Sequence, residues 1–255
     1  MNSPVSAEAL QHFLSAYASG MKDFFVPEVS FDSAGSWKQV YRIWSVQSRM
    51  SPKQIDGYLT LRREPRGHDI ALEVQQQTIM HGTGPGPLHS RPFSYWQKAS
   101  IQCQNNRWST PQYWSAESWG TDQEGKVEAI TQVKFSAEVS GDQIKFPGHG
   151  KPPIRVGIEW TMDWALMDAL QRLETPQRNE LVLDLIEDLG ALRPSQRLAF
   201  ISPFKAELVG KSTELYGFCR VGTGTLPVTY LLDMNHRLLL VMHNQRAFIL
   251  QPKMS

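Results

Sequence analysis

The order of hydrophobic and polar residues between positions 37 and 146 predicts a series of β-strands. Apolar and polar residues alternate with a period of two in the runs 40–46, 70–74 and 93–103, which are rich in β-branched and aromatic residues. Further strands are expected at 57–63, 108–119, 126–139 and 143–146. Gly, Pro and Asn stand at the breaks, and this spacing is typical of an antiparallel meander rather than of strands alternating with helices.

Two segments have the helical period. Residues 6–21 begin with a serine suited to cap a helix and carry a modest apolar face. In the segment 160–173, apolar residues recur at helical spacing, while Asp163, Asp168 and Gln171 fall on the other side. We therefore expect an amphipathic helix that covers the open side of the sheet and holds these carboxylates in solvent.

The segment 177–189 has two interpretations. Thr175-Pro176 resembles a helix start and Gly190 a helix stop, which favours a helix and a helical insert over 160–189. Leucines at 181, 183 and 185 alternate as they would in a strand.

The last 60 residues return to strand patterns. Strands are expected at 196–201, 204–209, 214–221, 226–233, 237–242 and 246–250. Turn sequences at 233–236 and 243–246 would make the end of this 196–250 region a three-strand meander. The expected fold is mainly β: a strongly curved antiparallel sheet or open half-barrel, with one or two helices packed across it, in one domain over 1–255.

The charge is nearly balanced overall but not along the chain. There are 26 Lys+Arg and 25 Asp+Glu, a net charge of +1. This sum combines −3 over residues 1–36, +5 over 37–119, −6 over 120–190 and +5 over 191–255. The balance argues against a nucleic-acid protein, which usually has a strongly basic face. The blocks either pair with one another or leave a basic patch that attracts an anionic ligand.

Several protein classes are excluded by what the sequence lacks. No apolar run is long enough for a transmembrane helix. The first 25 residues have no signal-peptide pattern, so a cytoplasmic location is expected, or export if a signal was removed. The two cysteines, Cys103 and Cys219, are expected to be buried free thiols rather than a disulfide framework.

The segment 80–93 is the most unusual local sequence. It contains three glycines, three prolines, His81 and His89, without a dinucleotide or phosphate-loop pattern. No third ligand completes a metal set around the two histidines, so no metal and no cofactor are expected. The segment is either a structural connection between strands or the edge of a site in which a histidine acts as general base.

Aromatic side chains are dense between positions 93 and 119. Tyr95, Trp96, Trp114 and Trp119 could stack on a ligand, because their rings offer large rigid faces. The alternative is that these rings fill the core of a wide sheet. Trp96 and Trp114 each stand next to another aromatic residue on the opposite face of the strand, so some rings are expected to point outward.

Four segments together resemble a group of uncharacterised β-rich proteins of planctomycete type. They are 37–44 (WKQVYRIW), 99–103 (ASIQC), 164–173 (WALMDALQRL) and 222–233 (GTGTLPVTYLLD). The chain is also loosely similar to the half-barrel of bacterial lipoprotein carriers. That resemblance implies a curved sheet that wraps around helices and holds acyl chains, and it assigns no catalytic residue.

Three functions follow as hypotheses. The first is a non-enzymatic binding protein that holds a lipid-like or aromatic small molecule within the curved sheet. The second is an enzyme on a small polar or sugar-like substrate, with His81 or His89 as general base. The third is an assembly subunit that pairs through exposed strand edges of the C-terminal meander. The oligomeric state is left open.

Overall fold

The computed structural model describes residues 7–16, 24, 26–27, 29–45, 56–80, 93–122, 124–174, 180–208, 210–243 and 246–251. Within them, 15 strands form one sheet in the order β8-β7-β6-β5-β4-β3-β2-β1-β15-β14-β13-β12-β11-β10-β9. The strands are β1 (Trp37–Ser45), β2 (Gly57–Arg66), β3 (Asp69–Met80), β4 (Phe93–Gln104), β5 (Pro111–Thr121), β6 (Val127–Ser140), β7 (Gln143–Lys145), β8 (Ile154–Arg155), β9 (Trp160–Met162), β10 (Glu180–Glu187), β11 (Ala191–Leu208), β12 (Lys211–Gly222), β13 (Thr225–Asp233), β14 (Leu238–His243) and β15 (Arg246–Leu250). The helices are α1 (Ala7–Ala16) and α2 (Asp163–Arg172).

The sheet consists of two meanders that meet at its centre. We call β1–β8 the first half and β9–β15 the second half. They join where β1 pairs antiparallel with β15, with Tyr41 opposite Leu250. Every pairing is antiparallel except that between β9 and β10. The chain passes from the first half to the second between β8 and β9, the two end strands of the sheet, and α2 follows β9.

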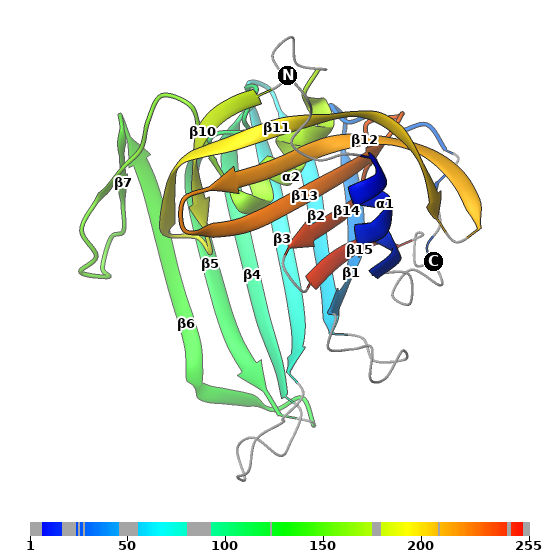
Figure 1. The fold of residues 1–255 in the computed structure, drawn as a ribbon. Coiled ribbons are helices and arrows are strands. Elements are labelled where there is room, and N and C mark those ends of the chain that lie inside the picture. Colours follow the sequence, from blue (N-terminus) through cyan, green and yellow to red (C-terminus); the bar gives the residue numbers. More distant parts are fainter. Residues whose placement is uncertain are drawn as a thin grey trace.

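The sheet is curved, so that its second half lies across its first half. Figure 1 shows β11–β13 passing in front of β2–β5, with α2 between them and α1 on the outer side of the second half. Leu10 and Leu14 of α1 are buried there, and Gln11 accepts a hydrogen bond from the backbone of Glu207 in β11. The expected mainly β fold, with a single curved antiparallel sheet and two helices, is confirmed.

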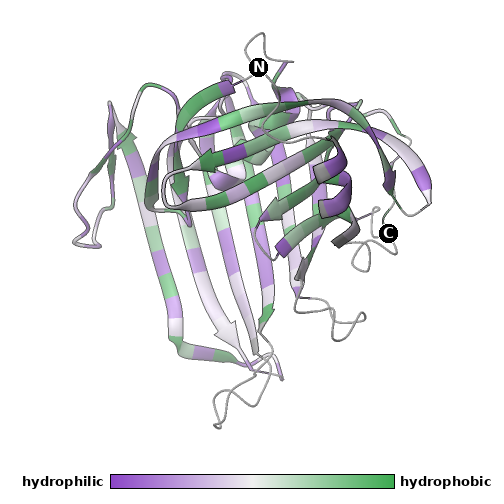
Figure 2. Ribbon diagram, in the orientation of Figure 1, coloured by the Kyte–Doolittle hydropathy of each residue, from purple (hydrophilic) through white to green (hydrophobic). Residues whose placement is uncertain are grey.

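The two halves differ in how many faces they bury. In the first half, buried residues alternate with exposed ones; in β4, Ile101 is buried and Gln102 exposed. In the second half, consecutive residues are buried along β12, β13 and β14, as in the run 228–233 of β13, whereas β10 and β11 alternate over much of their length. Figure 2 shows this contrast as alternating colours along β3–β6 and more continuous green in β13–β15. A sheet covered on both faces needs such apolar runs.

Helix α2 is enclosed on all sides, contrary to the expectation of a solvated polar face. Its residues Trp164–Gln171 are all buried, including Asp168 and Gln171 at 0% exposure. No side chain caps the helix at its N-cap residue, Met162, and the Thr161 hydroxyl donates to the backbone oxygen of Trp108. Helical spacing correctly identified which side of the helix carries the polar residues. It could not show that these residues bind buried side chains of other elements.

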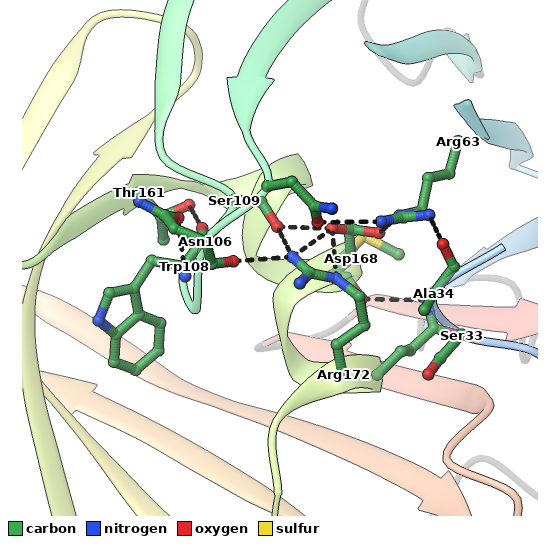
Figure 3. A network of polar contacts seen from close by, with 12 residues as sticks. Ser33, Ala34, Arg63, Asn106, Trp108, Ser109, Thr161, Asp168 and Arg172 are labelled. Atoms are coloured by element: carbon green, nitrogen blue, oxygen red, sulfur yellow. Dashed lines mark hydrogen bonds and ion pairs between the residues drawn. The ribbon is translucent and has the colours of Figure 1, made fainter. Parts of the chain in front are cut away.

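Two arginines neutralise the Asp168 carboxylate (Figure 3). The Arg63 Nε lies 2.8 Å from Asp168 Oδ1, with both side chains fully buried, and Arg172 Nη2 lies 3.0 Å from Oδ2. Ser109 Oγ donates to Oδ2 at 2.5 Å. Arg63 also donates to the backbone oxygens of Ala34 and Gly35. Burial lowers the pKa of Arg63, and the nearby Asp168 offsets part of that decrease. The contacts of this network tie β2, α2 and the β4–β5 turn together.

A second buried network ties α2 to the junction of the two halves. Gln171 Oε1 accepts from Gln39 Nε2 at 2.7 Å and from the backbone N–H of Leu238 at 3.0 Å. The Tyr41 hydroxyl donates to Gln39 Oε1 at 2.8 Å. The polar residues of α2 are therefore satisfied internally, by β1 on one side and β14 on the other.

The expected helix at 177–189 is wrong. Residues 180–187 form β10, which pairs with β11 and, in parallel, with β9. The alternation of Leu181, Leu183 and Leu185 was the correct signal, since Leu183 and Leu185 are buried while Val182 is exposed. Asp188 and Leu189 adopt positive φ in the turn that follows, so the segment ends in a tight hairpin rather than at a helix stop.

The expected strands 196–201 and 204–209 are one element. Strand β11 runs from Ala191 to Leu208, with a register shift between Ile201 and Phe204. The terminal meander β13–β14–β15 forms as expected, with the 233–236 turn in place. The 243–246 turn includes residues outside the described part.

The C-terminal meander does not offer the exposed edges that the assembly hypothesis needs. Strand β15 is paired on both sides, by β14 and by β1, and β12, β13 and β14 are interior strands as well. The sheet ends instead at β8 and β9. Cys103 and Cys219 are buried and free, as expected.

Candidate functional site

A hollow of about 780 Å³ lies on the outer face of the first half. Its side chains come from β1 to β6 and alternate with residues that point to the core, such as Val74 and Ala99. The lining side chains on this outer face are Lys38, Thr60, Arg62, Glu73, Gln75, Lys98, Ser100, Ser115, Glu117, Lys134 and Ser136, with His149 at the edge. We call this hollow the outer groove.

Strand register explains why the sheet is hollowed here. Ser100 of β4 lies opposite Ser115 of β5, which lies opposite Ser136 of β6. These three small side chains form a row, and the next row along the strands holds the longer Lys98, Glu117 and Lys134. Side chains two positions apart share one face of a strand, so short residues beside long ones leave a depression with hydroxyl groups on its floor.

The outer groove carries more positive than negative charge. Four Lys or Arg side chains and two Glu side chains line it. Lys134 pairs with Glu117 at 3.4 Å, and Arg62 pairs with Glu64 outside the groove. Within the described residues, neither Lys38 nor Lys98 forms an ion pair with a carboxylate. Three of the four bases belong to the basic block 37–119, so part of that block does form a basic patch.

Two tryptophans border the groove. Trp96 of β4 and Trp119 of β5 are opposite each other in register, with ring centroids 6.2 Å apart and planes within 7° of parallel. Both are half-buried and stand two residues from groove residues on the same face. The Lys98 ammonium lies 5.3 Å from the Trp119 ring centroid. The pair therefore offers partly exposed aromatic surface beside the hydroxyl floor and the basic side chains.

The other aromatic residues predicted to bind a ligand lie elsewhere. Trp114 is 0% exposed; it donates to the backbone oxygen of Leu189 at 3.2 Å and packs edge-on against Phe146. Its ring is therefore core. Tyr95 is half-buried and points to the opposite face from Trp96, opposite Thr78. The structure thus brings Trp96 and Trp119 together and separates both from Trp114 and Tyr95.

The two histidines predicted as general bases, His81 and His89, fall in residues 81–92, outside the described part of the chain. A role for either stays a prediction. In the described residues there is no group of three or more His, Cys, Asp or Glu that could hold a metal ion. None of the helices formed by those residues has the length and apolar character needed to cross a membrane.

A second cluster of charged groups lies where α2 begins. Glu187 of β10 pairs with Arg220 at 2.7 Å and with Arg193 at 2.8 Å. Burial alone would raise the pKa of Glu187, but hydrogen bonds from the two arginines lower it. Burial raises the pKa of Asp163 to about 7, although the backbone N–H groups of Asp188 and Trp164 bond its carboxylate. These groups mainly satisfy one another, so the cluster secures α2 to the second half.

No protein-family model matches the chain, and no curated protein matches it either. Two solved structures are similar to it. One is a β-barrel-like protein of domain of unknown function DUF1849 from Brucella abortus, with a TM-score of 0.54, 6% identity, and coverage of 85% of this chain and 95% of that one. The other is a DUF1089 family protein from Pseudomonas aeruginosa, with a TM-score of 0.38, 11% identity, and coverage of 89% and 97%.

The likeness to the DUF1849 protein shows a shared fold. At 6% identity it carries over no residue and no activity. It agrees with the expectation of a mainly β fold built on a curved antiparallel sheet. The two similar structures give no support for the planctomycete origin suggested by the sequence segments.

Proposed function

We propose that the chain is a non-enzymatic binding protein that takes a polar, ring-bearing ligand, a carbohydrate, on the outer face of its first half. The observation that carries the proposal is the parallel Trp96–Trp119 pair beside a hydroxyl-floored groove of about 780 Å³. Aromatic faces pack against the apolar faces of sugar rings, and Ser, Thr and Gln side chains suit their hydroxyls.

Binding within the curved sheet has less support than binding on its outer face. Helix α2, with eight consecutive buried residues, occupies space between the halves. Its polar side chains are engaged by Arg63 and Gln39 rather than facing a ligand. The aromatic-stacked ligand of the sequence-based hypothesis is therefore retained, and an acyl chain held inside the sheet is not.

The test is binding of a panel of hexasaccharides, namely cellohexaose, chitohexaose, xylohexaose and hexagalacturonate, by calorimetry. We expect the wild-type protein to bind at least one of them. Trp119→Ala should weaken that binding about tenfold or more, because it removes one ring of the pair. Tyr113→Ala is the matched control: it removes a 45% exposed aromatic from the same strand and face, outside the residues that line the groove.

Two results would overturn the proposal. One is that the wild-type protein binds none of the four saccharides. The other is that Trp119→Ala and Tyr113→Ala bind the saccharide as tightly as the wild type does. Unfolding curves of both variants must match that of the wild type, so that a loss of binding is not a loss of fold.

A further inference from the structure

The charged side chains that line the outer groove indicate which class of saccharide it would bind. We propose that the ligand is an anionic, extended saccharide, bearing carboxylate, sulfate or phosphate groups, which crosses the strands from β6 to β1. This inference rests on the proposed function, and it adds the charge of the ligand and the direction in which it lies.

The first argument is that positive charges far apart in the sequence meet in this one groove. Lys38, Arg62, Lys98 and Lys134 come from four different strands, and the register places Lys38 opposite Arg62 at one end. Glu64, which lies outside the groove, pairs with Arg62, and the acids within the groove are Glu73 and Glu117. Glu73 accepts a hydrogen bond from Ser100 at 2.7 Å, and Glu117 pairs with Lys134. Both acids are thus engaged locally.

The second argument is that part of this positive charge has no carboxylate partner among the residues that the structure describes. Lys38 and Lys98 form no ion pair among the described residues. Lys98 lies over the Trp119 ring, so a ring stacked on the tryptophans would place its substituents beside an ammonium group. Arg62, at 56% side-chain exposure, has a planar fork suited to a carboxylate or sulfate.

The third argument is the shape of the groove. It spans six neighbouring strands, a width of about 24 Å at the usual strand spacing. The serine row runs across the strands, with Lys134 near one end and Lys38 and Arg62 near the other. A single small anion would use one end of this surface, whereas a chain of sugars with repeated charges would use its whole length.

The experiment compares hexagalacturonate with its methyl ester, which has the same backbone without the charges. We expect the wild-type protein to bind the charged form about tenfold or more tightly, and this preference to shrink as salt is added. The double variant Lys38→Gln/Arg62→Gln should lose most of this preference, measured as the ratio of the two affinities, because it removes two positive charges from one end of the groove. The control Arg197→Gln/Lys211→Gln removes the same charge from exposed positions of the second half and should keep the preference.

Each alternative outcome has a distinct meaning. Equal affinity for both forms, with Trp119→Ala still weakening binding, overturns this inference and leaves the proposed function standing. Equal losses in the two double variants overturn it too, since the attraction would then be general. Tighter Lys38- and Arg62-dependent binding to phosphatidylglycerol vesicles than to hexagalacturonate would replace the saccharide with a membrane surface. Absence of binding to either saccharide and to the whole panel removes the proposed function as well.

Discussion

The two halves of the sheet use the same type of strand in two different ways. The first half buries one face and exposes the other, so its strands alternate, as Ile101 and Gln102 do in β4. In the second half, strands β12–β14 are buried on both faces, so neighbouring residues such as Leu231 and Leu232 are both 0% exposed. A binding groove needs a sheet face that is not packed in the core, and the first half has such a face.

Arg62 and Arg63 test this contrast within a single strand, and we expect the largest effect there. Arg63→Ala leaves Asp168 buried with one partner fewer, which should cost about 3–5 kcal/mol of unfolding free energy. Arg62→Ala, on the exposed face of the same strand, should change stability by less than ~0.5 kcal/mol. Urea unfolding of both variants measures the difference. Similar costs for the two arginines would contradict the one-face description of the first half.

Pairs of adjacent residues sharpen the comparison between the halves. Leu231→Ala and Leu232→Ala should each destabilise the protein by about 3 kcal/mol, because both leucines are fully buried on opposite faces of β13. In β4, Ile101→Ala should cost a similar amount and Gln102→Ala almost nothing. Chemical denaturation of the four variants tests this. If either leucine proves neutral, one face of the second half is not packed as described.

The smallest expected effect concerns the attachment of α2 to the second half. Because the pKa of Asp163 is raised from 3.8 to about 7, the folded protein holds this proton more tightly than the unfolded chain does. The contribution of Asp163 to stability is therefore complete below about pH 4 and is lost as pH rises to about 7. Asp163→Asn removes this loss, so its stability relative to the wild type should rise between pH 5 and pH 8, by about 1.4 kcal/mol for each pH unit between 5 and the raised pKa.

The measurement is the difference in unfolding free energy between wild type and Asp163→Asn at pH 5 and at pH 8. Taking the difference cancels groups such as Glu187, whose lowered pKa acts in the opposite direction. A difference that does not change between the two pH values would show that Asp163 ionises in the folded protein as it does in water.

The sequence predicted the strands better than it predicted the surroundings of the helix. Alternation was enough for β1–β6, because each of these strands has one wet face, and the pattern records it directly. It misled at Asp168 and Gln171, which look solvated by helical spacing but bond to Arg63 and Gln39 from distant strands. The prediction of a helix over 177–189 was wrong because it relied on the apparent helix start at Thr175-Pro176 and stop at Gly190. The alternating leucines indicated a strand.

The candidate site was only half visible in the sequence. Aromatic density pointed to Trp96 and Trp119, and the charge blocks pointed to a basic patch. Strand register was the missing information, since it alone places Lys38, Arg62, Lys98 and Lys134 on one surface. Trp114 resembles Trp119 in the sequence, but the two are five positions apart, and an odd offset puts their rings on opposite faces of β5.

The pairing of β1 with β15 has a consequence for biosynthesis. When β1 leaves the ribosome it can pair with β2 at once, but its other neighbour is the last strand of the sheet. Its edge, rich in aromatic and β-branched residues, stays unpaired until β15 has been made, about 200 residues later. Late closure of such long-range contacts is slow, so this edge is open to mispairing for longer than edges that close between strands adjacent in the sequence.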